Sequence, residues 1–155
     1  MERRDKINYY LDIAETVSER STCLRRHYGA VIVKNDIIIS TGYNGSPRGI
    51  QNCSEIGHCH RENSPRGTDY NLCPGVHAEQ NAIINCSRSE MLGSILYLVG
   101  KELNNEYIKD ANPCALCKRL IINSGIERVF IRIDRDNWTT IDVNNWNLDN
   151  IIGGY

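Results

Sequence analysis

The chain has 155 residues, 41% hydrophobic and 24% charged, as expected for one globular domain over residues 1–155. Its net charge of −1 provides no basic footprint for nucleic acid, so a small-molecule substrate is expected rather than a polynucleotide. The sequence shows neither an apolar run of about 18 residues that could span a membrane nor the apolar stretch of a secretory signal. Seven cysteines in such a chain indicate metal binding in a cytoplasmic protein rather than disulfides.

The first half of the chain shows a helical pattern, then strand patterns, then a long loop. Apolar residues recur at helical spacing over 5–20, which predicts an amphipathic helix. Two runs rich in β-branched residues, 30–33 and 37–39, flank a Lys-Asn-Asp turn and predict a hairpin. The Gly- and Pro-rich stretch 42–49 begins a loop that continues to about residue 75. A loop of this length in a small domain needs something to order it, and a second metal ion is one candidate.

The second half alternates between helices and strands. A helix is predicted from residue 77 to about 91, followed by a strand at 95–99. After a polar insertion at 101–112, another helix is predicted from 114 to about 124, where a glycine ends it. Residues 127–133 alternate as in a strand, and the Asn- and Asp-rich tail has no clear pattern. This order predicts an α/β fold, a three-layer α/β/α sandwich with a mixed, roughly five-stranded sheet.

Two predicted helix starts carry the residues that most strongly indicate chemistry. A His-Ala-Glu tripeptide begins at His77, and a Pro-Cys-Ala-Leu-Cys motif ends at Cys117. His77, Cys114 and Cys117 offer three soft ligands, which leaves a tetrahedral zinc with one open position, as in catalytic sites. Water bound there ionises near neutral pH, and Glu79 is placed to move its protons. A Cys-x2-Cys pair alone would fit a structural half-site equally well, but the complete pattern is that of zinc nucleobase deaminases.

These motifs resemble the cytidine and deoxycytidylate deaminase superfamily, most closely its deoxycytidylate (dCMP) deaminases. The similarity covers residues 5 to about 133. It includes the two zinc motifs, Gly29-Ala-Val-Ile-Val, Thr41-Gly-Tyr-Asn-Gly-Ser-Pro and Ser124-Gly-Ile. The resemblance implies hydrolytic deamination of dCMP to dUMP and ammonia, in pyrimidine deoxynucleotide metabolism. Zinc-bound hydroxide would attack C4 of cytosine while Glu79 delivers protons to N3 and to the departing amine.

The resemblance also implies how the nucleotide would be bound. The backbone at Ala78 would contact the base, and Asn44 would contact the sugar. The Gly-rich loop and a nearby arginine would hold the phosphate, with Arg48 and Arg26 as the candidates. Each of these arginines could equally well be an ordinary surface residue without a role in binding.

Regulation and assembly are implied by the same resemblance. In relatives of this type, dCTP activates and dTTP inhibits through a site at a subunit interface, and the assembly is often a hexamer. Here Gly45 and Arg88 occupy positions that contribute to that site or lie near it. The chain is therefore expected to form a homo-oligomer, and its effector would be dCTP with Mg²⁺.

Cysteines outside the catalytic motif are spread over three segments. Several dCMP deaminases carry a second, structural zinc, and by this resemblance Cys23, Cys53 and Cys73 would bind such an ion. His58 or Cys59 would complete a closed four-ligand site that pins the long loop against the first helix. The alternative is a set of reduced, partly buried thiols.

Departures from the family pattern leave other functions open. The insertion at 101–112 precedes the zinc helix and is expected to change the pocket wall. After the fourth strand the chain lacks the aromatic that lines the base pocket in relatives. Trp138 either substitutes for that aromatic or is a core residue. One alternative is therefore a deaminase of cytidine, guanine or tRNA adenosine. The others are a zinc-stapled nucleotide-binding module without turnover, which would not explain Glu79, and an inactive relative that senses nucleotides.

Overall fold

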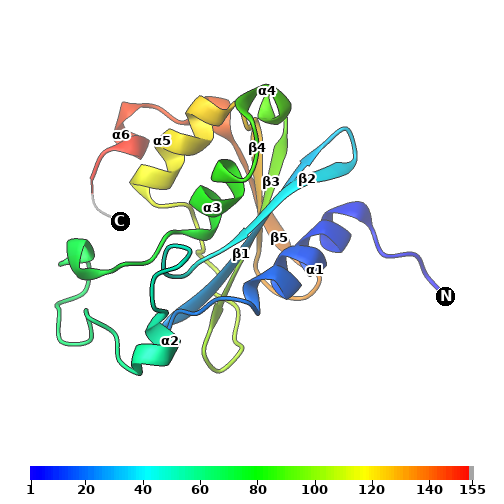
Figure 1. Ribbon diagram of the computed structural model, residues 1–155. Helices are drawn as coiled ribbons and strands as arrows, with labels where there is room; N and C mark the ends of the chain where they lie inside the picture. The colour runs from blue at the N-terminus through cyan, green and yellow to red at the C-terminus, as the bar shows by residue number, and fades with distance from the viewer. Residues whose placement is uncertain (154–155) are drawn as a thin grey trace.

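The computed structural model describes residues 1–153 and shows a mixed sheet between two layers of helices (Figure 1). The strands lie in the order β2-β1-β3-β4-β5. Only β3 and β4 run parallel, and the other neighbours pair antiparallel. The strands are β1 (Arg26–Lys34), β2 (Ile37–Tyr43), β3 (Ile95–Glu102), β4 (Arg128–Arg132) and β5 (Trp138–Asp142). The expected three-layer α/β/α fold is confirmed.

Six helices and two single 3₁₀ turns complete the described part of the chain. None of the helices within residues 1–153 is long and apolar enough to cross a bilayer. The helices are α1 (Lys6–Ser18), α2 (Cys53–Ile56), α3 (Ala78–Ile84), α4 (Arg88–Met91), α5 (Ala115–Ser124) and α6 (Leu148–Ile151), and the 3₁₀ turns are η1 (Tyr70–Leu72) and η2 (Val143–Asn145).

Each face of the sheet is buried by different helices (Figure 1). Side chains alternate along β1, so Val31 and Val33 pack with α1 while Ala30 and Ile32 join the opposite cluster. That second cluster includes Ala82 of α3 and residues of α5. Burial on both faces explains why β1 reads as a continuous apolar run rather than an alternating one.

Two glycines in the first hairpin let helices lie directly on strand backbone. A Cβ at Gly29 would lie 2.0 Å from the carbonyl oxygen of Ala14 in α1. A Cβ at Gly42 would lie 2.4 Å from the carbonyl oxygen of Ala78 in α3. Any side chain at either position would push a helix off the sheet. Gly42 therefore sets how close the start of α3 comes to β2.

The helix predicted over 77–91 is wrong as a single element. It divides into α3, which ends at Asn85, and α4, whose N-cap is Ser87. The Ser87 hydroxyl accepts a hydrogen bond from the Glu90 amide. Asn and Ser side chains compete for backbone hydrogen bonds inside helices and favour their ends, so α3 ends at Asn85 and α4 begins after Ser87.

The tail without a clear pattern supplies the fifth strand. β5 pairs antiparallel with β4, from Arg128 opposite Asp142 to Arg132 opposite Trp138. The Trp138 ring packs edge-on against Phe130, with ring centroids 5.0 Å apart, in the cluster that α1 covers. Trp138 is thus a core residue on the α1 face, and it does not replace the aromatic expected in the pocket.

The segment 101–112 packs onto the domain although it reads as a polar insertion. Ile108 and Ala111 are buried in the cluster shared with α3 and α5. Tyr107 forms a bridge with Lys101, and its hydroxyl donates to the Glu15 carboxylate at 2.8 Å. These anchors follow neither strand nor helix periodicity, so the sequence pattern did not predict their burial.

A buried ion cluster joins β4 to α1. The Arg132 side chain is fully buried and donates to Asp12 and to Glu15, each at 2.7 Å. It also donates to the Asn8 carbonyl at 3.1 Å. The Lys101 ammonium lies 2.5 Å from the Glu15 carboxylate oxygen that does not accept from Arg132. Because the Arg132 guanidinium is withdrawn from water, loss of Asp12 or Glu15 leaves its charge less compensated.

Replacing Glu15 by Gln is expected to destabilise the fold at neutral pH and to make it less sensitive to acid. Burial favours a raised pKa for Glu15, but hydrogen bonds from Lys101 and Tyr107 outweigh it and hold the pKa below its ordinary 4.5. Such a carboxylate stabilises the fold above its unfolded pKa, and this contribution is lost as the pH falls through the folded pKa. Urea unfolding at pH 7 should show a loss of about 2 kcal/mol, and the difference from the parent should narrow below pH 4.5.

The matched control is Glu106→Gln, because the Glu106 side chain is exposed in the same part of the fold. Its stability should follow that of the parent at every pH. A Glu15→Gln protein that differs from the parent by the same free energy at pH 4 and pH 7 would show that Glu15 does not ionise with a lowered pKa.

Candidate active site

The starts of α3 and α5 bring three metal-binding atoms together. His77 Nδ1 lies 3.2 Å from Cys117 Sγ and 3.6 Å from Cys114 Sγ, and all three atoms lie within 4.8 Å of one another. Ligands of a tetrahedral zinc, with bonds of about 2.3 Å to sulfur and about 2.1 Å to nitrogen, are separated by about 3.6 Å. The three side chains therefore fit one zinc ion.

Local hydrogen bonds place these ligands at helix termini. His77 is the N-cap of α3, and its amide donates to Gln80 Oε1 at 2.9 Å in a capping box. Cys114 is the N-cap of α5, and its sulfur accepts from the Cys117 amide at 3.5 Å. Pro113 precedes the helix, where its missing N–H costs least. The positive ends of both helices thus point to one spot and favour thiolate there.

The pKa values of Cys114 and Cys117 are shifted in opposite directions. The hydrogen bond from Cys117, together with His77, lowers the pKa of Cys114 to about 4. The pKa of Cys117 is raised because its proton is held in that bond and because burial and Glu79 oppose a second negative charge. A divalent cation would supply the positive charge that lets both sulfurs ionise. The chemistry of this donor set, as well as its geometry, therefore fits a metal.

Glu79 lies in the first turn of α3 with its side chain almost completely buried, at 5% exposure. Burial raises the pKa of its carboxyl group, and the nearby Cys114 thiolate raises it further against the opposing effect of His77. A buried carboxyl with a raised pKa beside a metal site is a candidate for proton transfer.

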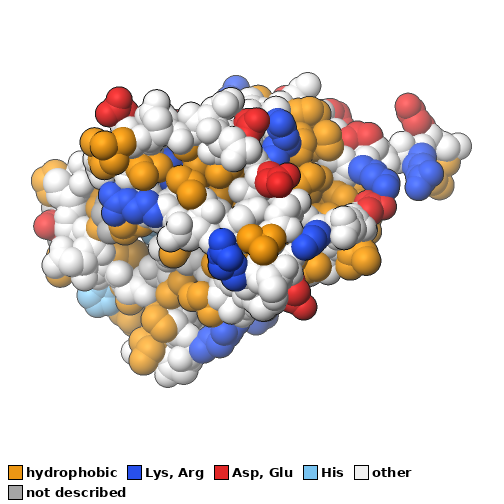
Figure 2. Space-filling model, turned by 90° about the horizontal axis from the view of Figure 1, so that it is seen from above, with side chains coloured by type: hydrophobic (Ala, Val, Ile, Leu, Met, Phe, Trp, Pro, Cys, Tyr) orange, Lys and Arg blue, Asp and Glu red, His pale blue; other side chains and the backbone are white. Residues whose placement is uncertain are grey.

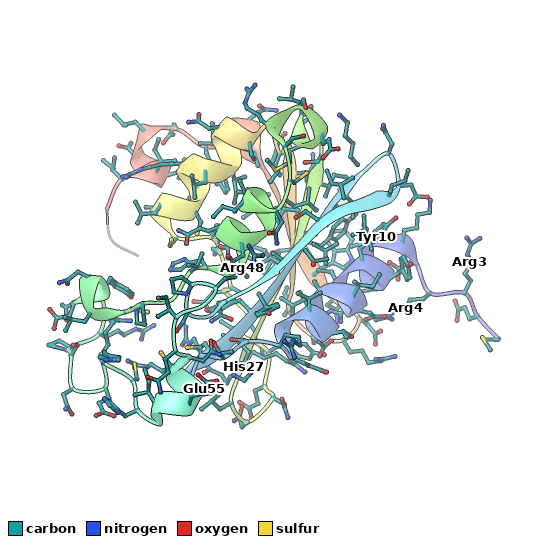
Figure 3. The ribbon with its side chains drawn as sticks, in the orientation of Figure 1. Arg3, Arg4, Tyr10, His27, Arg48 and Glu55 are labelled. Carbon is teal, nitrogen blue, oxygen red and sulfur yellow. The ribbon has the colours of Figure 1, made fainter. Side chains whose placement is uncertain are left out.

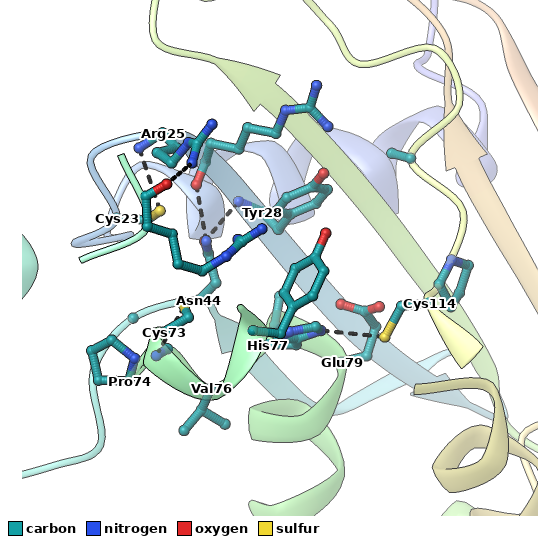
Figure 4. Close-up of a pocket in the computed structure, with 18 of the residues that line it drawn as sticks. Cys23, Arg25, Tyr28, Asn44, Cys73, Pro74, Val76, His77, Glu79 and Cys114 are labelled. Carbon is teal, nitrogen blue, oxygen red and sulfur yellow. Dashed lines mark hydrogen bonds between the residues drawn. The ribbon is translucent and has the colours of Figure 1, made fainter. Parts of the chain in front are cut away.

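A cavity of about 980 Å³ opens over these residues (Figure 4). Such a volume lies in the range of pockets that enclose small-molecule ligands. His77, Glu79 and Cys114 line one part of it, and the cysteine-rich loop lines another. Its further lining includes Arg25, Arg26, Tyr28, Asn44, Gly45, Cys59, Arg61, Arg66, Ala78, Asn112, Lys118, Asn150 and Ile152.

Of the residues predicted to bind substrate, some line the cavity and others do not. Ala78 is buried and lines the cavity beside Glu79. Asn44 also lines it, but its amide is engaged with β1, accepting from the Tyr28 N–H at 2.8 Å and donating to the Arg26 carbonyl at 2.9 Å. Asn44 therefore fastens the Gly-rich loop to β1.

The two candidate arginines lie in different places. Arg26 lines the cavity, with its guanidinium 3.2 Å from the Glu102 carboxylate. Arg48 is exposed outside the cavity lining, where it donates to Asn85 at the end of α3 at 2.8 Å (Figure 3). The structure thus leaves Arg26 and not Arg48 at the cavity.

The two residues expected near an effector site are not brought together within one chain. Gly45 pairs with Val76 and lines the cavity. Arg88 is outside that lining, on α4, where it donates to the Asn123 carbonyl at 2.7 Å.

The cysteines expected to form a second metal site line one cavity, but their sulfur atoms are farther apart than the ligand atoms of the His77 cluster. Cys23, Cys53, Cys59 and Cys73 all line the same cavity, whereas His58 does not. Within residues 1–153, only the His77 cluster has its ligand atoms within 4.8 Å of one another. The four cysteines thus lie near one another without forming a closed site.

Several lining residues were not predicted from the sequence. Tyr28 had a usable signal, because alternation along β1 puts it on the same face as Ala30 and Ile32, toward α3 and α5. Arg66 comes from the irregular cysteine-rich loop, and Asn150 comes from the tail. Neither segment has a periodicity that could have indicated its approach to the site.

Similarity to known proteins covers most of the chain. The model of the cytidine and deoxycytidylate deaminase zinc-binding region matches residues 4–133. The deoxycytidylate deaminase of Mycobacterium phage D29 is 40% identical over 136 residues, which cover 83% of this chain and 95% of the relative. The deoxycytidylate deaminase of Schizosaccharomyces pombe is 37% identical over 126 residues, or 79% of this chain, which spans only 35% of that larger protein.

Solved structures agree with this similarity. The dCMP deaminase of cyanophage S-TIM5, in complex with dCMP and dUMP, superposes with a TM-score of 0.61 at 29% identity, covering 84% of each chain. A cytidine deaminase from Burkholderia pseudomallei shares the fold, with a TM-score of 0.57 at 16% identity, covering 87% of this chain and 91% of that chain. The matched region contains the whole cluster at the starts of α3 and α5. The chain belongs to the cytidine and deoxycytidylate deaminase zinc-binding family.

Proposed function

We propose that this protein is a zinc-dependent dCMP deaminase that hydrolyses dCMP to dUMP and ammonia. The observation that carries the proposal is the His77, Cys114 and Cys117 cluster with buried Glu79 beside it, in a cavity large enough for a nucleotide. The D29 phage relative, which this chain spans almost completely, is a deoxycytidylate deaminase, and the S-TIM5 enzyme binds dCMP and dUMP.

Glu79 is the proton carrier in the proposed reaction. A zinc ion held by His77, Cys114 and Cys117 would act as a Lewis acid and lower the pKa of the attacking water. Glu79 would carry both protons of the attacking water in turn: the first goes from the water to N3 of cytosine, and the second goes from the hydroxyl then on C4 to the amine that leaves. The burial that raises its pKa suits both steps, because it makes the carboxylate a better proton acceptor than an exposed one.

The remaining cavity residues support nucleotide binding. Ala78 lines the cavity next to Glu79 and would contact the base through its backbone, and Asn44 would lie near the sugar. Arg25, Arg26 and Arg66 place positive charge on the lining, which favours a phosphate group. Charges of both signs are interspersed on the face seen in Figure 2, which fits a small anionic ligand better than a polynucleotide.

The test is a substrate panel with ammonia release as the readout. We expect dCMP to show the highest kcat/KM among dCMP, CMP, deoxycytidine, cytidine, guanine and a tRNA substrate. Preferred turnover of a nucleoside, of guanine or of tRNA would assign one of the alternative deaminase activities instead. If folded, metal-loaded protein releases ammonia from none of these substrates, the protein is not a deaminase of this group, and the interpretation as a nucleotide-binding module or sensor is favoured.

A second, structural zinc on Cys23, Cys53, Cys59 and Cys73 forms part of the proposal. Three of these sulfurs accept an amide N–H from two residues ahead, at 3.4 Å each: Cys23 from Arg25, Cys59 from Arg61 and Cys73 from Gly75. Hydrogen bonds of this kind orient and stabilise a thiolate ligand. Cys59 is a better fourth ligand than His58, because it shares the cavity lining with the other three.

Cys53→Ser is expected to lower the metal content from two ions per chain to one. Serine offers a hydroxyl where zinc prefers a thiolate, so only Cys23, Cys59 and Cys73 would remain as ligands. Elemental analysis of the purified protein measures the count. Cys86→Ser is the matched control, because Cys86 lies outside both clusters and contacts Glu90. Two ions retained in Cys53→Ser would contradict the second site.

We further propose a cytoplasmic homo-oligomer, such as a hexamer, that responds to dCTP with Mg²⁺. Exposed apolar side chains of Ile84, Leu116 and Leu120 on α3 and α5 support association, because large apolar side chains gathered on neighbouring helices mark interaction surfaces. Light scattering after size exclusion measures the assembly. Turnover with and without dCTP and Mg²⁺ tests the regulation, and a monomer with constant turnover would remove both claims.

A further inference from the structure

Residues 146–152, here called the α6 segment, lie against α5 and reach the catalytic cavity (Figure 1). Asn150 and Ile152 are among the residues that line this cavity, as are Cys114 and Lys118 of the zinc-site region. Trp146 is partly buried against the core cluster shared by α3 and α5. The segment therefore forms part of the cavity wall beside the proposed metal ligands.

Two cations of α5 hold the α6 segment in place. Lys118 Nζ donates to the Asn150 carbonyl at 3.2 Å, and Arg119 Nε donates to the Ile151 carbonyl at 2.9 Å. The Lys118 ammonium also lies 5.5 Å from the centre of the Trp146 ring. The last carbonyls of a helix lack partners within the helix and carry partial negative charge, so cations there are stabilising. The wall is thus fastened by the two residues that directly follow Cys117.

Apolar packing alone does not explain this position. Of residues 146–152, only Trp146 packs into the core cluster, while Leu148 and Ile152 remain 68% and 53% exposed. The segment also lies beyond residue 133, where the match to the deaminase family ends. The family model therefore does not include this segment, and its contacts with α5 place it at the cavity.

We propose that the α6 segment is a specificity-determining wall of the nucleotide site and that Arg119 is its positioning residue. The inference rests on the proposed function, because the ligand it binds is the nucleotide substrate. Asn150 and Ile152 contact the bound nucleotide when the segment is fastened to α5. Arg119 is outside the cavity lining and acts only through the segment, whereas Lys118 is itself part of the lining.

Arg119→Met tests the inference because it removes the guanidinium and keeps an apolar stem. Steady-state kinetics with dCMP should show KM raised roughly tenfold and kcat within about twofold of the parent, since binding is lost and the chemistry at Glu79 is untouched. Arg119→Lys should restore most of the affinity, because an ammonium can still donate to the Ile151 carbonyl. Arg3→Met removes a surface cation from the N-terminal arm, remote from the cavity, and should behave as the parent (Figure 3).

Hydrogen exchange gives a second readout, which does not require turnover and is measured first on the parent protein. Amides of residues 148–152 should exchange more slowly in the parent when the product dUMP is bound, and this protection should weaken in Arg119→Met. A parent that leaves dCMP intact removes the proposed function and this inference with it. Turnover of dCMP with an unchanged KM in Arg119→Met, or no protection of these amides by dUMP, overturns the inference alone.

Discussion

Glu79→Gln is expected to lower kcat for dCMP about a thousandfold while the protein stays folded and keeps its zinc. The amide has nearly the shape of the carboxyl group but can neither accept the proton of water nor deliver it to the base. Because burial penalises the charged carboxylate and raises its pKa, the neutral amide should leave thermal stability unchanged or raise it. Ammonia release, elemental analysis and thermal unfolding of the same sample measure the three effects.

The matched control is Glu90→Gln, which changes an exposed carboxylate on the neighbouring helix α4. Its kinetics should equal those of the parent. A Glu79→Gln protein with parental kcat would assign proton transfer to another group. A variant that is inactive because it has lost its metal would show that Glu79 supports the ion rather than the reaction.

Cys114→Ser is expected to abolish turnover and to remove one metal ion per chain. Serine keeps the N-cap, since a hydroxyl accepts the Cys117 amide as well as a sulfur does, but it is a poor zinc ligand. His77 and Cys117 alone would then hold the ion, and the contact between the starts of α3 and α5 would weaken. We expect loss of the ion, a kcat reduced at least about a thousandfold and a lower melting temperature.

A chelator provides the complementary experiment on the parent protein. Removal of the metal should stop ammonia release, and added zinc should restore it without refolding. Full activity in metal-free protein, or in Cys114→Ser, would contradict the assignment of these residues as ligands of a catalytic ion.

Local sequence patterns predicted most of the helices and strands that form the three layers. The periodicity of α1, the β-branched runs of β1 and β2, and the glycine after α5 each arise from local backbone preference. The break between α3 and α4 was missed because the helical spacing of apolar residues continues across Asn85 and Ser87. β5 was missed because an edge strand is fixed by its pairing with β4 more than by its own composition.

The sequence by itself determined the chemistry that this chain can perform. His77, Cys114 and Cys117 are recognisable because zinc requires particular ligand types, and a helix start presents them at a fixed spacing. The tertiary structure decided which other groups reach that site. Arg26 came to the cavity and Arg48 did not, and residues 148–152 turned back onto α5. Those placements depend on contacts between segments far apart in the chain, and such contacts leave no local periodicity to read.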